Sequence, residues 1–276
     1  MTRAPEKAGG RAPEVRDVDA VVVGAGVSGL YAMHRLRGIG LDVVGIEAGA
    51  EVAGTWYWNR YPGCRCDVPT IEYSYSFDEQ LEQEWIFPET MSAQPEIEAY
   101  LNHVADRFDL RRSFLFSTKV TAATWDEAAS RWEIETDRGD RLRATWCVMA
   151  TGSLSAPNVP PIPGIESFAG EVVHTGLWPR EGVDVGGKRV GIIGTGSSAI
   201  QSIPHIARQA DSLVVFQRTA NFAVPAWNQA LEADYIAEVK ATYPERREVC
   251  RQSQAGFPPP PTPIEGNALE ATQEER

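Results

Sequence analysis

Cysteine, methionine and histidine are scarce, with four residues of each among the 276 of this chain. The cysteines are too few and too scattered for the disulfide framework of a small secreted domain: Cys64, Cys66, Cys147 and Cys250. Neither a redox C-x-x-C spacing nor a second metal-binding pair accompanies Cys64-Arg-Cys66, which argues against thioredoxin-like and zinc-finger sites. We therefore predict reduced thiols, no metal site and a cytoplasmic location.

Positive charge is also in short supply. The 26 lysines and arginines are outnumbered by 38 aspartates and glutamates, which gives a formal net charge of −12. A polyanionic partner such as nucleic acid is not expected. No apolar run approaches the ~20 residues of a membrane-spanning helix, so no membrane partner is expected either. Residues 1–17 lack the apolar core of a signal peptide and predict a disordered tail.

Two glycine-rich loops, each following an apolar run, are the most informative feature that is present. The first is Gly24-Ala-Gly26-Val-Ser-Gly29 after Val18–Val23, and the second is Gly194-Thr-Gly196-Ser-Ser-Ala199 after Arg189–Ile193. In this motif the first glycine permits a tight turn, the second lets backbone approach a pyrophosphate, and the third lets helix and strand pack closely. Alanine is an accepted third residue. A purely structural turn is the alternative, but it does not explain the residues that follow.

A different charged residue follows each loop at roughly the 20-residue distance of the ribose-binding position. Glu47 ends the run Val43–Ile46, and a carboxylate there binds ribose hydroxyls. Arg218 ends Leu213–Gln217, and a guanidinium there suits a 2′-phosphate, although a solvated charge is the alternative. Two different dinucleotides imply electron transfer between them. The sequence therefore predicts a flavoprotein that takes hydride from NADPH.

The repeated order of strand, loop, helix and strand predicts an α/β fold of two Rossmann-like, three-layer dinucleotide-binding domains, both incomplete. The predicted divisions are a disordered tail (1–17), an FAD-binding part (18–156), a linker with an NADPH-binding part (157–227), and a helical, then proline-rich and disordered tail (228–276). Helices are predicted at 27–38, 92–108 and 231–239, and antiparallel strands at 120–125, 132–136 and 141–149. Ser92 or Gln94-Pro95-Glu96 is expected to cap the second helix, and Pro244 to interrupt the region after the third.

Between the loops lies Phe168-x-Gly170-x-x-x-His174-x-x-x-Trp178-Pro179. Its spacing forms no metal-binding or acid–base set, so by itself it indicates an inter-domain linker in which His174 has a hinge or packing role. With this segment, with Gly54–Asp67 and with Gly194–Gln201, the chain resembles the type I Baeyer–Villiger monooxygenase family. The resemblance extends from Val18 to about Asn228, and phenylacetone and steroid monooxygenases are the most similar in pattern.

The resemblance implies a role for each matching residue. FAD would be bound by Gly24, Gly26, Ser28, Gly29, Glu47, Thr55, Trp56, Tyr57, Trp58, Asp67, Tyr73 and Val120. NADPH would be bound by Thr195, Gly196, Ser197, Ser198, Ala199, Ile200, Gln201, Arg218 and Thr219. Nicotinamide would meet flavin at Arg65, Cys66 and Asp67, where Asp67 orients a catalytic arginine absent from this chain. A linker coupling domain rotation to catalysis would contain Phe168, Gly170, His174, Trp178 and Pro179. For Trp58 and Tyr61 simple packing is the alternative.

The implied reaction uses NADPH, FAD and O2 to convert a ketone into an ester or lactone through a flavin peroxide. Family members continue for about as long again, so the chain is expected to be a truncated N-terminal half, with the missing C-terminal half as a separate partner chain. Alone it is expected to bind FAD weakly and to turn over ketones poorly.

Two alternatives stay open: an NADPH oxidase or flavin reductase, and a non-catalytic nucleotide-binding fragment. Disulfide reductases are disfavoured, because no C-x-x-x-x-C or C-x-x-C pair follows the first loop. The sequence does not indicate which ketone is used, the regio- and stereoselectivity, or the oligomeric state.

Overall fold

A computed structural model describes residues 15–154, 156–223, 225–254 and 256. The chain forms two compact units: one contains the residues up to Cys64 together with Ala93–Phe222, and the other contains Arg65–Ser92 together with the residues from Ala223 onward. Most of the predicted N-terminal tail and the proline-rich end of the chain lie outside the described residues. The division into an FAD part and an NADPH part stays a prediction.

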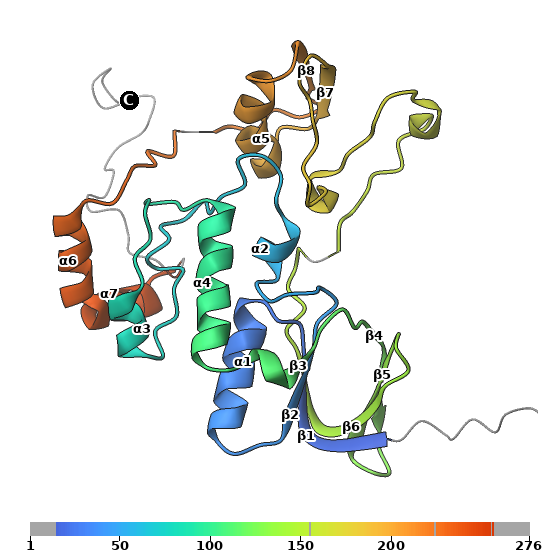
Figure 1. Cartoon of the computed structure of the whole chain (residues 1–276), viewed down its shortest axis with the longest axis vertical. Coiled ribbons are helices and arrows are strands. Elements are labelled where there is room, and N and C mark those ends of the chain that lie inside the picture. Colours follow the sequence, from blue (N-terminus) through green and yellow to red (C-terminus); the bar gives the residue numbers. More distant parts are fainter. Residues whose placement is uncertain (1–14, 155, 224, 255, 257–276) are drawn as a thin grey trace, which may run out of the picture. The chain divides into compact units, whose positions relative to one another are not determined.

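The first unit is built on a six-stranded sheet with the order β3-β2-β1-β6-β5-β4 (Figure 1). Its strands are β1 (Val15–Val23), β2 (Val43–Ile46), β3 (Phe114–Leu115), β4 (Val120–Asp126), β5 (Arg131–Thr136) and β6 (Arg141–Met149). Strand β1 pairs in parallel with β2 on one side and β6 on the other, whereas β4, β5 and β6 are antiparallel neighbours. The α/β class is therefore confirmed.

Strand β1 begins earlier than the sequence predicted. Residues 15–17 were assigned to the disordered tail, but Val15 aligns with Arg141 and Asp17 aligns with Arg143 in the parallel pairing of β1 with β6. The Asp17 carboxylate also accepts hydrogen bonds from Nε and Nη2 of Arg143, at 2.7 and 2.9 Å. This pairing depends on residues far apart in the sequence, which local composition could not reveal.

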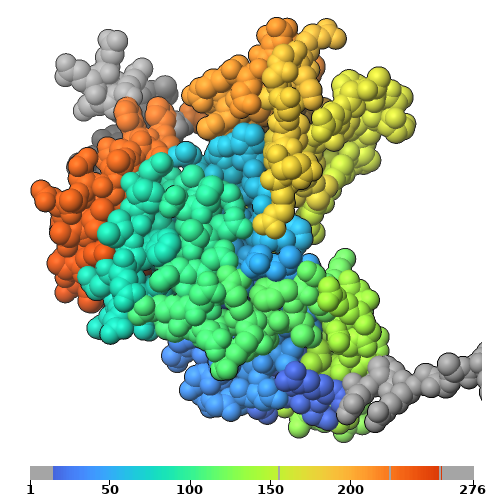
Figure 2. Space-filling view, in the orientation of Figure 1, coloured from blue at the N-terminus to red at the C-terminus, as the bar shows by residue number. Residues whose placement is uncertain are grey.

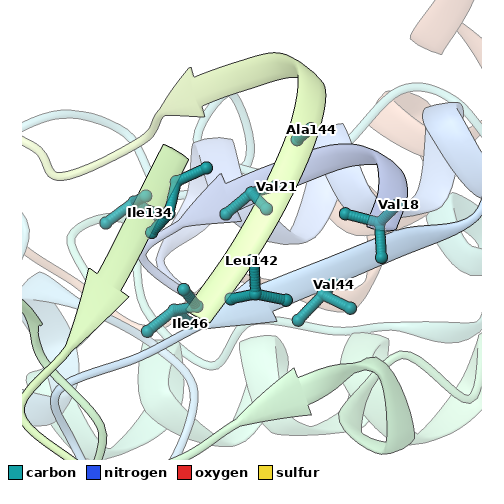
Figure 3. Packing of buried hydrophobic residues seen from close by; sticks show 8 residues of the cluster. Val18, Val21, Val44, Ile46, Ile134, Leu142 and Ala144 are labelled. Atoms are coloured by element: carbon teal, nitrogen blue, oxygen red, sulfur yellow. The ribbon is translucent and has the colours of Figure 1, made fainter. Parts of the chain in front are cut away.

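The core of the sheet is a cluster of aliphatic side chains (Figure 3). Its members are Val18, Val21, Val23, Val44, Ile46, Ile134, Leu142 and Ala144. They come from the parallel strands and from the antiparallel hairpin alike, and Val18 aligns with Ala144 where the two parts join. Strand β6 pairs with β1 on one side and with β5 on the other, so the predicted antiparallel strands and the predicted nucleotide-binding strands form one sheet.

The helices of the first unit lie at predicted positions, except for one short helix at residues 55–58 that the sequence did not predict. They are α1 (Val27–Gly38), α2 (Thr55–Trp58), α4 (Gln94–Arg107) and α5 (Ser197–Ala207), with short 3₁₀ turns η1 (Arg111–Ser113), η2 (Ile165–Ser167) and η3 (Thr175–Leu177). Helix α4 buries one apolar face, which contains Ile97, Tyr100, Leu101 and Val104. Of the two predicted starts, Gln94-Pro95-Glu96 is confirmed and Ser92 is wrong: Ala93 is the N-cap, and Pro95 lies in the first turn, where an N–H would have no helical partner.

The second glycine loop lies in a smaller assembly of the same unit. Strands β7 (Arg189–Ile193) and β8 (Ser212–Phe216) form a parallel two-stranded sheet, and α5 connects them. Many apolar side chains of this pair stay exposed: Ile193, Val214, Val215 and Phe216. Figure 2 shows these strands in gold and orange at the surface.

The other compact unit contains α3 (Glu79–Glu84), α6 (Ala233–Ala241) and α7 (Tyr243–Gln252). Its small core contains Ile71, Val239 and Tyr243, and the Arg247 Nε donates to the Glu82 carboxylate at 2.9 Å. Pro244 does break the helical region, but it also lies in the first turn of a further helix, a position that proline favours. None of the helices in the described part of the chain has the length and apolarity that crossing a membrane requires.

Candidate functional site

The first glycine loop packs closely against backbone at its first and third glycines. Gly24 has φ +104°, and a Cβ there would lie 2.5 Å from the carbonyl oxygen of Ala150, at the end of β6. A Cβ on Gly29 would lie 1.9 Å from the carbonyl oxygen of Gly24. Gly26 is the N-cap of α1, and no side chain caps the helix. The loop therefore presents a helix N-terminus, with the exposed Ser28 in its first turn, to an anion such as a diphosphate.

Glu47, at the end of β2, is a buried carboxylate, and only 5% of the residue is exposed. One oxygen accepts from the Ala25 backbone N–H at 2.7 Å, and the other accepts from the Gly49 N–H at 2.6 Å. No cation pairs with Glu47 among the described residues. An ionised carboxylate offers about four acceptor positions, so two are left for hydroxyl donors. These two acceptor positions fit the ribose hydroxyls of a dinucleotide, because a buried carboxylate needs further hydrogen bonds to offset its desolvation.

The aromatic segment after the first loop is held against that loop. The Ala53 N–H donates to the Ala25 carbonyl at 3.0 Å, and a Cβ on Gly54 would lie 2.7 Å from the Gly26 Cα. Gly26 and Gly54 thus allow the two backbone segments to come into direct contact. In α2, Trp56 and Tyr57 are buried, Thr55 is half-buried and Trp58 is exposed. Val120, at the start of β4, is half-buried.

Four predicted site residues belong to the other compact unit. Arg65 pairs with Glu89 at 3.1 Å, Tyr73 is half-buried, and the exposed Asp67 carboxylate makes no hydrogen bond or ion pair to any described residue. Cys66 is buried, and burial raises the pKa of its thiol, with a further contribution from the Asp67 carboxylate. Burial also raises the pKa of the Cys147 and Cys250 thiols. These thiols are protonated at neutral pH, which disfavours nucleophilic or redox chemistry.

The second loop repeats the backbone of the first but is open. Gly194 has φ +107°, and a Cβ at Gly194 or Gly196 would meet nothing within 4 Å. Gly196 is the N-cap of α5, again with no side-chain cap. The Thr195 Oγ1 accepts from Gln217 Nε2 at 3.0 Å. The helix N-terminus and the exposed Ser197 are therefore accessible to a phosphate.

The residues that would select the second nucleotide are also accessible. Arg218 and Thr219 follow β8 and are exposed, and the Arg218 guanidinium makes no ion pair within the described ranges. Along α5, Ser198 and Ala199 are half-buried and Ile200 is 42% exposed. The Gln201 Oε1 accepts a hydrogen bond from the Tyr61 hydroxyl at 2.9 Å, a contact that spacing in the sequence could not indicate.

The fingerprint segment before the second loop has little regular structure. Phe168 is 63% exposed, and a Cβ on Gly170 would lie 2.5 Å from its ring. The His174 Nδ1 accepts from the Gly176 N–H at 3.1 Å and so caps η3. Trp178 and Pro179 are half-buried. The structure thus gives His174 a local capping contact. No cluster of metal-ligating side chains occurs in the described part of the chain.

Two residues of the site were missed by the sequence analysis. Ala150 limits the space at Gly24, and the signal for it was the Ala150-Thr-Gly152 turn after a strand. Arg180, directly after the fingerprint, contacts Tyr57, and no sequence signal indicated this contact.

Comparison with known proteins agrees with this geometry. The family model described as pyridine nucleotide-disulphide oxidoreductase matches residues 21–254. A Baeyer–Villiger monooxygenase of Pseudooceanicola batsensis is 49% identical over 228 residues, which cover 82% of this chain and 42% of that protein.

Solved structures give the same result. The oxidised steroid monooxygenase bound to NADP is 56% identical, with a TM-score of 0.87, over 94% of this chain and 49% of that one. The OTEMO complex with FAD and NADP is 41% identical, with a TM-score of 0.84, over 89% and 47% respectively. The chain thus spans about half the length of the relatives that it matches. It belongs to the pyridine nucleotide-disulphide oxidoreductase family, in the branch that contains the Baeyer–Villiger monooxygenases.

Proposed function

We propose that this chain supplies the FAD- and NADPH-binding part of a Baeyer–Villiger monooxygenase, which inserts one oxygen atom of O2 beside a ketone carbonyl to give an ester or lactone. The observation that carries the proposal is the pair of glycine loops with opposite selectors, Glu47 after the first and Arg218 after the second. The similarity to a steroid monooxygenase bound to NADP and to a complex with FAD and NADP supports it.

The first loop fits FAD. The uncapped N-terminus of α1 would bind the diphosphate, and Ser28 is placed to donate its hydroxyl. Glu47 would accept from the adenosine ribose with the two acceptor positions that the loop amides leave. Thr55, Trp56, Tyr57 and Trp58 follow Gly54, whose backbone touches Gly26, so they would lie along the same nucleotide.

The second loop fits NADPH. The uncapped N-terminus of α5 would bind the diphosphate through residues 195–201. Arg218 is exposed and unpaired within the described residues, so its guanidinium is free to bind a 2′-phosphate with two parallel hydrogen bonds. Thr219 would add a hydroxyl to the same group.

FAD, when bound, would supply the redox chemistry between NADPH and O2. The contribution of this chain is to bind both nucleotides, orient them and limit the access of water. Asp67 would hold a guanidinium from the part that this chain lacks, since its carboxylate is exposed and unpaired among the described residues. A carboxylate beside a guanidinium keeps that cation oriented.

The partner we propose is a polypeptide equivalent to the other half of the relatives. Strand β6 pairs with β5 only through Arg141–Ala144, although it continues beside β1 to Met149. Beyond Ala144 no described strand covers that edge, and Trp146 and Met149 are 61% and 60% exposed. An unpaired edge with apolar side chains is a template for one more strand. None of the four cysteines, all of which the structure describes, is in a disulfide, which favours a reducing compartment such as the cytoplasm.

The test is to express this chain alone, together with a polypeptide equivalent to the missing half, and as one continuous chain of the relatives' length. Bound flavin is measured by absorbance, and ester formation from a panel of ketones with NADPH and O2 by gas chromatography. We expect little flavin and no ester from the chain alone, and both from the combined forms. Trp146→Lys should reduce co-purification of the two halves, whereas Ile39→Lys, also at an exposed apolar position, should not.

Other results would favour the alternatives. NADPH consumption with stoichiometric hydrogen peroxide and no ester from any ketone would favour an NADPH oxidase. Failure of every form to retain flavin after reconstitution would favour a non-catalytic fragment. Ester formation by the chain alone would contradict the need for a partner.

A further inference from the structure

Arg180 directly follows the Trp178-Pro179 end of the fingerprint segment and lies against helix α2. Its guanidinium carbon is 4.6 Å from the centre of the Tyr57 ring, and its Nη1 donates to the Tyr57 hydroxyl oxygen at 3.3 Å. A guanidinium over an aromatic face is attracted by the electrons of the ring. One side chain thus makes two different contacts with the same tyrosine.

Tyr57 is a fixed surface for this contact. Its ring is buried, and its hydroxyl also accepts from the Ala50 backbone N–H at 3.2 Å. The Trp58 ring meets it edge-on at 4.9 Å. A cation that binds to an immobile ring loses less conformational freedom than one that must also order its partner. Tyr57 is therefore suited to hold a segment that approaches from elsewhere in the unit.

Helix α4 provides the complementary charge. The Glu98 carboxylate lies 3.9 Å from the Arg180 Nη2, and its other oxygen accepts from Gln94 Nε2 at 2.8 Å. Gln94 Nε2 donates in addition to the Trp56 carbonyl. The contacts of Arg180 therefore reach α2 and α4, two elements that are already joined to each other.

We propose that Arg180 is a positioning residue that seats the fingerprint segment, residues 168–179, on helix α2 through Tyr57. A functional consequence rests on the proposed function: the segment predicted to couple domain rotation to catalysis is attached to the helix predicted to contact the flavin. A movement of the segment would then break the contacts of Arg180 with Tyr57, and binding at α2 would restrain the segment.

Hydrogen exchange of the full chain without added nucleotide tests the seating. We expect Arg180→Ala to speed amide exchange in peptides covering residues 168–178 by about five- to tenfold, because the cation–aromatic contact and the ion pair are both lost. Exchange in α1 should stay unchanged. Arg180→Lys should restore much of the protection, because it keeps a cation over the ring but not the planar hydrogen-bonding fork.

Arg60 provides the matched control. Its guanidinium carbon is 5.2 Å from the same ring, but it belongs to the segment that directly follows α2 and not to the fingerprint. Arg60→Ala should leave exchange over residues 168–178 at the wild-type rate. Equal exchange in Arg180→Ala and wild type, or an equal acceleration by Arg60→Ala, would overturn the proposal. If the seating is found but no form makes ester, the proposed function fails while the seating stands.

Discussion

The two glycine loops have nearly the same backbone but very different surroundings. Gly24 and Gly194 have φ of +104° and +107°, and the N-caps Gly26 and Gly196 have φ of −80° and −73°. In the first loop a Cβ at Gly24 or Gly29 would collide with backbone atoms, whereas in the second a Cβ at Gly194 or Gly196 would meet nothing within 4 Å. The motif therefore fixes the local turn, and the surrounding sheet decides how much substitution the turn tolerates.

The third motif position should show the largest difference. Gly29→Ala would place a methyl group 1.9 Å from the Gly24 carbonyl oxygen, so we expect a loss of about 3 kcal/mol or more in unfolding free energy. The second loop already carries Ala199 there. The reverse change, Ala199→Gly, should lower stability by only about 1 kcal/mol, the difference in helix propensity. Urea denaturation followed by circular dichroism measures both, and equal losses would contradict the comparison.

The strand residue that enters each loop gives the next test. Val23 is 8% exposed at the end of β1, and Ile193 is 69% exposed at the end of β7. Val23→Ala should lower the unfolding free energy by about 2 kcal/mol, because buried methyl groups are lost. Ile193→Ala should lower it by less than about 1 kcal/mol, mainly through strand propensity. A larger loss at Ile193 would mean that β7 is covered in solution.

Substitutions of the two selector residues, Glu47 and Arg218, should differ in their effect on the stability of the chain as well as on nucleotide binding. Glu47→Gln should destabilise the chain by about 1–3 kcal/mol, because an amide nitrogen would face a backbone N–H donor in a buried site. Arg218→Ala should change stability by less than about 0.5 kcal/mol, since the residue is exposed. Thermal unfolding of both variants without nucleotide measures this, and a destabilised Arg218→Ala would reveal a structural role.

Acid should lower the stability of the six-stranded sheet through the ion pair between Asp17 on β1 and Arg143 on β6. Hydrogen bonding to Arg143 holds the pKa of Asp17 below its ordinary value of 3.8. The stability from this carboxylate is therefore present above that value and is lost as the pH falls through the lower native pKa. The Asp17→Asn variant should therefore lose slightly less stability than the wild-type chain when the pH is lowered from 5 to below the native pKa of Asp17. Identical pH profiles of the urea midpoint would show that the exposed pair contributes nothing.

The sequence predicted what depends on neighbours along the chain. Helix α1 has the predicted bounds, Val27–Gly38, because the glycine loop and the apolar spacing are local signals. Both strand–loop–helix–strand repeats formed as expected, and the comparisons confirm the family that the fingerprint indicated.

Contacts between distant residues were not predictable in the same way. For helix α4 the start at Ser92 was wrong and the alternative start at Gln94 was right; the backbone N–H of Ser92 donates to Thr70 and its hydroxyl to the Glu89 carbonyl. The pairing of β1 with β6 joins residues more than a hundred positions apart, and periodicity does not specify which strands pair. The Arg180–Tyr57 contact is of the same kind. The roles assigned to individual site residues stay predictions.

The most direct test of the account is calorimetric titration of the chain, and of its Arg218→Ala variant, with NADP⁺ and NAD⁺. We predict that the wild-type chain prefers NADP⁺ by about tenfold or more and that the variant loses this preference, because a charge-assisted contact with the 2′-phosphate is removed. FAD binding by the variant should be unchanged. An undiminished preference for NADP⁺ in Arg218→Ala would contradict the assignment of the two loops to two different nucleotides.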